Sequence, residues 1–142
     1  MSAFSPAELE YLATQRMGRL ATVGPDGAPH VVPVSYRYNP DSDTIDIGGH
    51  ELGATKKWRD IGLDPRVAFV VDDVLPPWQP RLIEIRGEAL RLNAGGDALG
   101  RGFSGELIRI SPRHVVAYGI DEVERRWKVG SRDVDPAAPV RS

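Results

Sequence analysis

Residues 45–60 of this chain read Ile45-Asp-Ile-Gly-Gly-His-Glu-Leu-Gly-Ala-Thr-Lys-Lys-Trp-Arg-Asp60. The alternation of apolar and polar residues up to Gly48 predicts a short strand, and the residues after Gly49 predict a turn followed by a helix. Glycine has no side chain, so a ligand could approach the backbone closely where this strand ends. The stretch therefore indicates a strand–turn–helix unit with room for a ligand at the strand end.

The first turn of the predicted helix carries Thr55, Lys56 and Lys57. A helix start presents unpaired N–H groups, the hydroxyl adds a further donor, and the two lysines add positive charge. Together these groups favour the binding of a phosphate. The alternative is a surface helix whose lysines are solvated, because charged helix starts are common.

The composition is that of a soluble, single-domain protein. The chain has 142 residues, of which 27% are charged and 41% hydrophobic. Its net charge is −2, so the chain lacks the excess of positive charge that is typical of a nucleic-acid-binding protein. The absence of cysteine excludes disulfides, thiolate metal ligands and thiol chemistry. No signal-peptide pattern and no apolar run of ~18 residues occurs, so we expect a cytoplasmic protein with neither a membrane nor a nucleic-acid partner.

Outside residues 45–60, the chain alternates with the period of strands rather than helices. One helix is predicted to begin at Ser5-Pro6-Ala7-Glu8, a capping pattern, and to end near Met17-Gly18. The segment 66–71 is apolar on both faces, which predicts a central, buried strand. The predicted strands are 19–23, 30–38, 44–48, 66–71, 81–92 and 106–110, the last resuming at 114–118 after Ser111-Pro112. Six strands with turn signals between them favour a small antiparallel barrel.

Two segments lack this alternation. Residues 94–105 are rich in glycine, with room for one helical turn. The residues from Asp121 onward are charged and end in Asp135-Pro-Ala-Ala-Pro139. We therefore expect a folded domain over 1–121 and a flexible tail over 122–142.

The second predicted strand has an unusual proline. Pro33 cannot donate a backbone hydrogen bond, so it marks an edge, a bulge or a place where something other than a strand lies alongside. A planar ring could dock against Val32, Pro33 and Val34 and bond to the free backbone groups. The alternative is an ordinary edge strand.

The usual catalytic patterns are absent from the sequence. It contains no Gly-x-Ser-x-Gly elbow, no Gly-x-x-x-x-Gly-Lys loop and no Gly-x-Gly-x-x-Gly fingerprint. The three histidines have no metal-ligand spacing, so we expect no metal site. Asp72-Asp73 could bind a cation, but a solvated strand end is the simpler interpretation. A phosphate site and a ring platform without an acid, base or nucleophile indicate that a cofactor carries the reaction.

Four motifs in order resemble a known family. They are Gly18-Arg-Leu-Ala-Thr-Val-Gly-Pro-Asp-Gly-Ala-Pro-His-Val-Val-Pro-Val34, then 45–49, 55–57 and 64–73. Over residues 4–120 the chain closely resembles the FMN-binding split-barrel superfamily. This superfamily includes pyridoxamine 5′-phosphate oxidase and reductases that use the deazaflavin coenzyme F420, and the chain is most similar to the short proteins of the deazaflavin branch.

The resemblance implies a six-stranded antiparallel split β-barrel of Greek-key topology with short flanking helices. It also implies a homodimer with the cofactor at the interface. Carried over by position, Thr55, Lys56 and Lys57 would bind the cofactor phosphate. Val32, Pro33 and Val34 would line the ring. Gly48 and Gly49 would form the strand end beside the ribityl chain. Trp78 could stack on a ring or fill a subunit interface. The arginines with which pyridoxamine phosphate oxidases hold the substrate phosphate have no match here.

Three functions follow as hypotheses. The first is an oxidoreductase that transfers a hydride from coenzyme F420 to an electron-poor C=C or C=N bond of a small organic substrate, with Tyr36 or His50 as a possible source of the proton. The second keeps the fold and uses FMN, as a pyridoxamine phosphate oxidase-like flavoprotein. The third is a non-catalytic flavin or tetrapyrrole binder.

Overall fold

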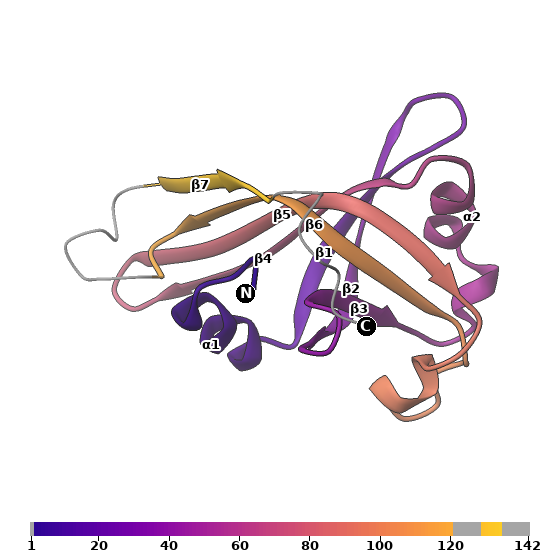
Figure 1. Ribbon diagram of the computed structural model, residues 1–142, viewed down its shortest axis with the longest axis horizontal. Coiled ribbons are helices and arrows are strands. Elements are labelled where there is room, and N and C mark those ends of the chain that lie inside the picture. Colours follow the sequence, from indigo (N-terminus) through magenta and orange to yellow (C-terminus); the bar gives the residue numbers. More distant parts are fainter. Residues whose placement is uncertain (1, 121–128, 135–142) are drawn as a thin grey trace.

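Six antiparallel strands close into a barrel, and two helices cover its ends (Figure 1). The computed structural model describes residues 2–120 and 129–134. The elements are α1 (Pro6–Thr14), β1 (Met17–Val23), β2 (Pro29–Asn39), β3 (Thr44–Gly48), η1 (Leu52–Ala54), α2 (Lys56–Leu63), β4 (Arg66–Leu75), β5 (Gln79–Leu92), η2 (Gly96–Leu99), β6 (Leu107–Tyr118) and β7 (Val129–Asp133). The neighbour order β3-β2-β1-β4-β5-β6 closes through pairing of β3 with β6. Because β4 lies beside β1, the order 4-1-2-3 is a Greek key, which confirms the expected fold class.

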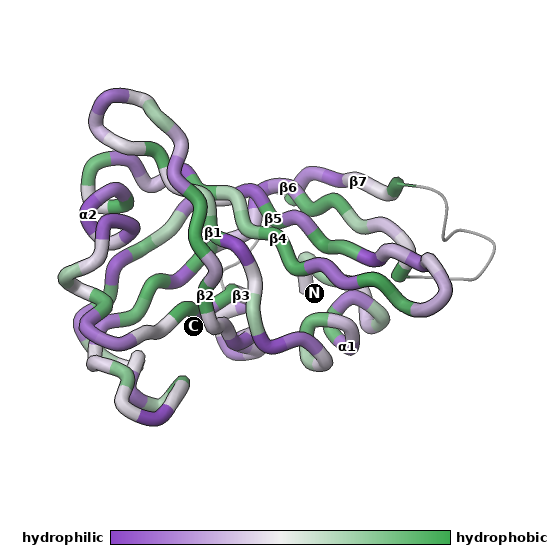
Figure 2. Tube along the Cα trace, turned by 180° about the vertical axis from the view of Figure 1, so that it is seen from behind, coloured by the Kyte–Doolittle hydropathy of each residue, from purple (hydrophilic) through white to green (hydrophobic). Residues whose placement is uncertain are grey.

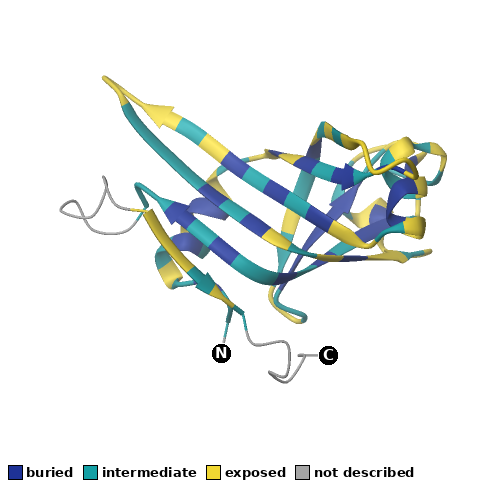
Figure 3. Ribbon diagram, turned by 90° about the horizontal axis from the view of Figure 1, so that it is seen from above, coloured by how far each residue is buried: buried dark blue, intermediate teal, exposed yellow. Residues whose placement is uncertain are grey.

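The core fills the inside of the barrel with alternate side chains of most strands, whereas all five residues of β3 are buried. In Figure 2 the strands are banded in green and purple, and in Figure 3 the same strands are banded by burial. Alternation puts one apolar set inside and leaves the other set outside. The fully buried members include Leu20, Ile45, Ile47, Phe69, Val71, Ile83, Ile85, Ile108, Ile110 and Val115.

Strand β4 is central, between β1 and β5, but in one chain only one of its faces is buried. Val67, Phe69 and Val71 point into the core, whereas Ala68 and Val70 are only partly covered. The expectation that both faces are buried is therefore wrong for the single chain. The physical reason is that the described helices cap the barrel ends and leave the outside of β4 bare (Figure 1).

Strand β6 continues through Ser111-Pro112, where the sequence predicted a break. The pairing with β5 shifts register between Arg86 and Gly87, a bulge that lets a proline sit within the ladder. A Cβ on Gly87 would lie 2.1 Å from the carbonyl oxygen of Ser111, so only glycine allows the strands to approach here.

The barrel opens along part of β2. Strand β1 pairs with β2 over residues 29–35, whereas β3 pairs with it only over residues 35–39. Residues 29–34 therefore have a strand on one side alone, among the strands the structure describes, so Pro33 lies at a sheet edge. This open edge lies in the arm formed by β1 and β2, which projects from the barrel beside α2 (Figure 1).

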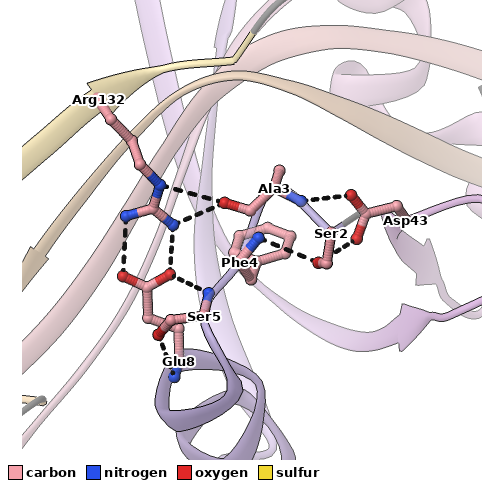
Figure 4. Close-up of polar contacts among 7 residues, drawn as sticks. All are labelled: Ser2, Ala3, Phe4, Ser5, Glu8, Asp43 and Arg132. Atoms are coloured by element: carbon pink, nitrogen blue, oxygen red, sulfur yellow. Dashed lines mark hydrogen bonds and ion pairs between the residues drawn. The ribbon is translucent and has the colours of Figure 1, made fainter. Parts of the chain in front are cut away.

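The N-terminal segment is held by the seventh strand (Figure 4). The guanidinium of Arg132 on β7 pairs with the buried carboxylate of Glu8 on α1 and donates to the carbonyl of Ala3 at 2.6 and 3.2 Å. On the other side, Asp43 accepts from Ser2 and from the Ala3 N–H. Helix α1 ends at Thr14, three residues before β1 begins at Met17, where the helix was expected to end.

One further strand, β7, lies within the segment that the sequence assigned to the tail. Val129–Asp133 pairs with β6 from Tyr118 back to His114, inside the segment 122–142 that the sequence assigned to the tail. The rest of that segment, 122–128 and 135–142, lies outside the described residues. In the part of the chain that the structure describes, no helix is long and apolar enough to cross a membrane.

Candidate functional site

Helix α2 begins at Lys56, and Thr55, which the sequence placed in the first turn, is its N-cap. The Thr55 hydroxyl donates to the Leu52 carbonyl at 2.7 Å and accepts from the Trp58 N–H at 3.4 Å. The hydroxyl therefore serves as a helix cap, and its proton is not available to a phosphate in this arrangement. The first N–H groups of the helix have no partner within it, as in any helix start.

Lys56 and Lys57 are adjacent in sequence but have different environments. The Lys56 ammonium donates to both oxygens of Asp60, each at 3.0 Å, four residues along the helix. Asp60 is 2% exposed and also accepts from the Thr22 hydroxyl at 2.8 Å, which ties α2 to β1. Burial alone would raise the pKa of Asp60, but the hydrogen bonds from Lys56 and Thr22 outweigh it and hold the pKa below its usual range.

Lys57 is partly buried and has no hydrogen bond or ion pair with any residue that the structure describes. Burial lowers the pKa of its ammonium group, because the charge has lost water without gaining a partner. A bound anion would supply that partner. Of the two predicted lysines, Lys57 is therefore the one that is free to hold a phosphate.

Gly48 and Gly49 also have different surroundings. A Cβ on Gly48 would lie 2.9 Å from the Phe103 ring and 3.1 Å from the Gly96 carbonyl oxygen, so packing against the 94–105 loop explains this glycine. A Cβ on Gly49 would meet only Leu52, at an ordinary 3.6 Å. The Gly49 carbonyl accepts from the Ser104 N–H and hydroxyl, which fixes the backbone beside the open space.

The residues predicted to hold a ring, 32–34, lie on the open part of β2. Val34 is buried, Val32 is partly buried and Pro33 is exposed. On the inner face of the same segment the sequence reasoning missed His30, whose Nδ1 is buried with no hydrogen-bond partner among the described residues. Its place directly opposite Thr22 in the β1–β2 register brings it beside Asp60. The signal that could have found it is the alternation that puts it on the face of Val32 and Val34.

Trp78 does not join these residues within one chain. It stands 69% exposed in the hairpin between β4 and β5, beside the exposed side chains of Val74 and Leu75. Figures 1 and 3 place this hairpin and α2 at opposite ends of the molecule. A Trp78 that takes part in the site must therefore come from a second chain.

The two suggested proton sources differ. The Tyr36 hydroxyl donates to the Leu12 carbonyl at 2.7 Å, and burial raises the pKa of this phenol, so it is a core group rather than an acid. His50 is exposed beside Gly49, with its Nδ1 2.8 Å from the Gly102 carbonyl oxygen. A neutral His50 that donates from Nδ1 keeps Nε2 as an acceptor.

The carboxylates at the end of β4 are paired internally. Asp72 pairs with Arg19 at 2.6 Å, and Asp73 accepts a bidentate contact from Arg81 and a bond from the Tyr11 hydroxyl. Across the described residues no group of three or more metal-ligating side chains comes together.

Comparison with known sequences decides the family. The family model described as pyridoxamine 5′-phosphate oxidase matches residues 4–125. The chain belongs to the pyridoxamine 5′-phosphate oxidase-like family. A relative from Streptomyces rimosus subsp. rimosus, 5a,11a-dehydrotetracycline/5a,11a-dehydrooxytetracycline reductase, is 43% identical over 133 residues, which cover 92% of this chain and 93% of the relative.

Solved structures share the fold. A FAD-binding protein from Mesorhizobium loti has a TM-score of 0.61 at 23% identity, over 80% of this chain and 92% of that one. The FAD binding protein from Mycobacterium smegmatis has a TM-score of 0.61 at 20% identity, over 82% of this chain and 96% of that one. A heme binding protein from the same organism has a TM-score of 0.63 at 16% identity, over 94% of this chain and 60% of that one. These similarities confirm the barrel and extend to the fold alone.

Proposed function

We propose that this protein is an oxidoreductase that binds coenzyme F420 and reduces an electron-poor C=C or C=N bond of a small organic substrate. The observation that carries the proposal is the ammonium of Lys57 at the start of α2, which has no partner among the described residues. The open backbone of Gly49 at the end of β3 and the free edge of β2 accompany it. These groups fit a flavin-type cofactor: a cation for the phosphate, an unobstructed backbone for the chain and an apolar edge for the ring.

The reductase relative supports the choice of reaction. Its substrates are named as 5a,11a-dehydro compounds, which denotes a carbon–carbon double bond in a ring system. With 43% identity over nearly the whole chain, a reduction of an activated C=C bond is the first activity to test. A bound deazaflavin would supply a hydride, and no residue of this chain needs to act as a nucleophile.

The chain's own residues would bind the cofactor, orient its ring toward the substrate and shield the reaction from water. Lys57 would fix the phosphate end, and residues 32–34 would hold the ring against the β2 edge. The 94–105 loop is joined to Gly49 through Ser104 and would set which acceptor fits. His50, exposed beside Gly49, is the better placed of the two suggested groups to deliver a proton from solvent.

A homodimer would complete the site. Side chains on the outer faces of neighbouring strands form a mostly apolar outer patch made of Ala21, Val23, Val31, Pro33, Ala68 and Val70. Arg19 lies between Pro33 and Val70 on this face and pairs with Asp72. Val31 in this patch is 65% exposed, and burying such a surface favours association. A second chain packed there would cover the bare face of β4 and could bring its Trp78 hairpin to the site. We expect such a dimer in the cytoplasm.

Titration of the purified protein with coenzyme F420 and with FMN, followed by fluorescence, tests the cofactor. Coenzyme F420 is expected to bind more tightly, and the reduced cofactor should be reoxidised by cyclic enones without oxygen consumption. Saturated analogues of the same enones are the matched controls. FMN binding ~10-fold or more tightly, or turnover that consumes oxygen, would replace this proposal with the FMN-dependent flavoprotein. Binding without turnover of any acceptor would favour the non-catalytic carrier.

A further inference from the structure

A cluster of polar side chains beneath α2 has no role in the cofactor binding described above. This α2 cluster consists of Lys56, Asp60, Thr22 and His30. The Asp60 carboxylate is 2% exposed and accepts three hydrogen bonds, two from Lys56 and one from Thr22. His30 lies opposite Thr22 on the same face of the β1–β2 arm, and its buried Nδ1 has no hydrogen-bond partner within residues 2–120 and 129–134.

Lys56 pairs with Asp60 and lies close enough to the start of α2 to pair with an anion bound there instead. Its ammonium is held by Asp60, but the side chain is 46% exposed and sits in the first turn of α2 next to Lys57. An anion at this helix start would attract Lys56 as well as Lys57. If Lys56 turned toward that anion, Asp60 would be left as a buried carboxylate without a cation, which is strongly unfavourable.

The group that can replace the lost charge is the imidazole of His30. Imidazole is the side chain that changes charge near neutral pH, and a carboxylate beside it favours the protonated form. We propose that Lys56 is a transferable cation: an anion bound at the start of α2 draws its ammonium away from Asp60, and His30 takes up one proton from solvent and replaces it beside the carboxylate. No other bond forms or breaks, and Asp60 keeps one cation beside it, while the net charge of the α2 cluster rises by the one proton taken up.

The inference rests on the proposed function, because it needs an anionic ligand at α2. It predicts that ligand binding is coupled to proton uptake, so binding is tighter at lower pH and weakens as the pH rises through the titration of His30 in the complex. Two other titratable groups lie close by in the chain: Lys57 follows Lys56 on α2, and Asp26 lies in the β1–β2 turn. A Cβ on Gly24 would lie 3.2 Å from the Lys56 ammonium and 3.3 Å from the Asp26 Oδ1. Lys57 and Asp26 are retained in a His30→Gln variant, so the difference between the two pH profiles reports His30.

The first test uses the protein without ligand. The sequence has three histidines, so their ring signals can be resolved by NMR, and His50 and His114 serve as internal controls. In Lys56→Met, which imitates the departure of the ammonium, the pH response of the His30 ring signals should move to higher pH relative to the wild type, while those of the controls stay in place. Lys56→Arg, which keeps the charge, should leave all three unchanged. A His30 pH response that does not move in folded Lys56→Met overturns the proposal.

The second test uses the wild-type protein and does not depend on the folding of a Lys56 variant. Calorimetric titration with coenzyme F420 and with FMN at pH 7, in two buffers of different ionisation enthalpy, counts the protons taken up. We expect uptake of roughly half a proton or more per ligand, and uptake near zero in His30→Gln. Binding with no uptake, or uptake that persists in His30→Gln, overturns this inference and leaves the proposed function standing. Failure of both ligands to bind overturns both.

Discussion

At the scale of single residues, the environment of a side chain separates groups that the sequence presents as equivalent. Lys56 neutralises the buried carboxylate of Asp60, whereas Lys57 is partly buried without a partner among the described residues. Their adjacency in sequence predicts two phosphate ligands, and the geometry assigns them different principal tasks. The spacing of Lys56 and Asp60, four apart on a helix, was the signal for the ion pair.

We therefore predict different outcomes for the two lysines. Lys57→Ala should weaken cofactor binding about 10–100-fold, the value of one charge-assisted contact, and leave the melting temperature of the apo protein nearly unchanged. Lys56→Ala should lower the free energy of unfolding by about 1–3 kcal/mol, because it leaves Asp60 buried without its cation. Fluorescence titration and urea unfolding measure the two effects. Equal loss of stability in both variants would contradict this division.

The two glycines at the end of β3 allow a second comparison. Gly49→Ala should fold with normal stability, since its Cβ would meet only Leu52 at 3.6 Å, and should bind cofactor less tightly if the ligand lies against this backbone. Gly48→Ala should instead destabilise the apo protein, because its Cβ would lie 2.9 Å from the Phe103 ring. Thermal unfolding and cofactor titration of both variants check this. Full affinity in Gly49→Ala would place the ligand elsewhere.

At the scale of elements, the sequence predicted those with a strong local pattern. β3 spans 44–48 as its alternation predicts, and the cap at Ser5 begins α1. β7 was missed because Val-Gly-Ser-Arg-Asp carries one large apolar side chain, and its pairing with β6 and the Arg132–Glu8 pair are long-range. Pro112 falsely indicated a break, because the bulge and Gly87 that accommodate it belong to two different strands.

The attachment of α2 to the barrel should depend on pH through Asp60. Its pKa is lower in the folded protein than in the unfolded chain, so its stabilising contribution is present above its unfolded pKa and is lost as the pH falls through the folded pKa. The difference in free energy of unfolding between the wild type and Asp60→Asn should therefore be present from about pH 7 down to about pH 5 and shrink below about pH 4. Urea unfolding at several pH values measures it. A difference that is the same at pH 3 as at pH 7 would show that Asp60 does not act through its charge.

At the scale of the whole molecule, the single chain leaves two features without a partner. The outer patch on β1, β2 and β4 is mostly apolar, and the Trp78 hairpin projects from the end opposite α2 (Figure 3). The sequence could predict that β4 is apolar on both faces, but it could not show that the outer face needs another chain. That depends on which surfaces the helices cover, a property of the assembled fold. For the same reason, local sequence patterns could not show that Trp78 and Lys57 lie at opposite ends of one chain.

We therefore predict a homodimer that forms through the outer patch. Light scattering at micromolar concentration should give twice the chain mass of 15.6 kDa for the wild type. Val31→Lys should give monomers, because it buries a charge in the interface, and should also weaken cofactor binding if the partner chain completes the site. Leu90→Lys is the matched control, since Leu90 is 55% exposed on β5 and lies outside the patch, so that variant should remain dimeric. A wild-type mass of one chain would remove the dimer and with it any role for Trp78 in the site. A monomeric Val31→Lys that retains full affinity would show instead that each chain binds its cofactor alone.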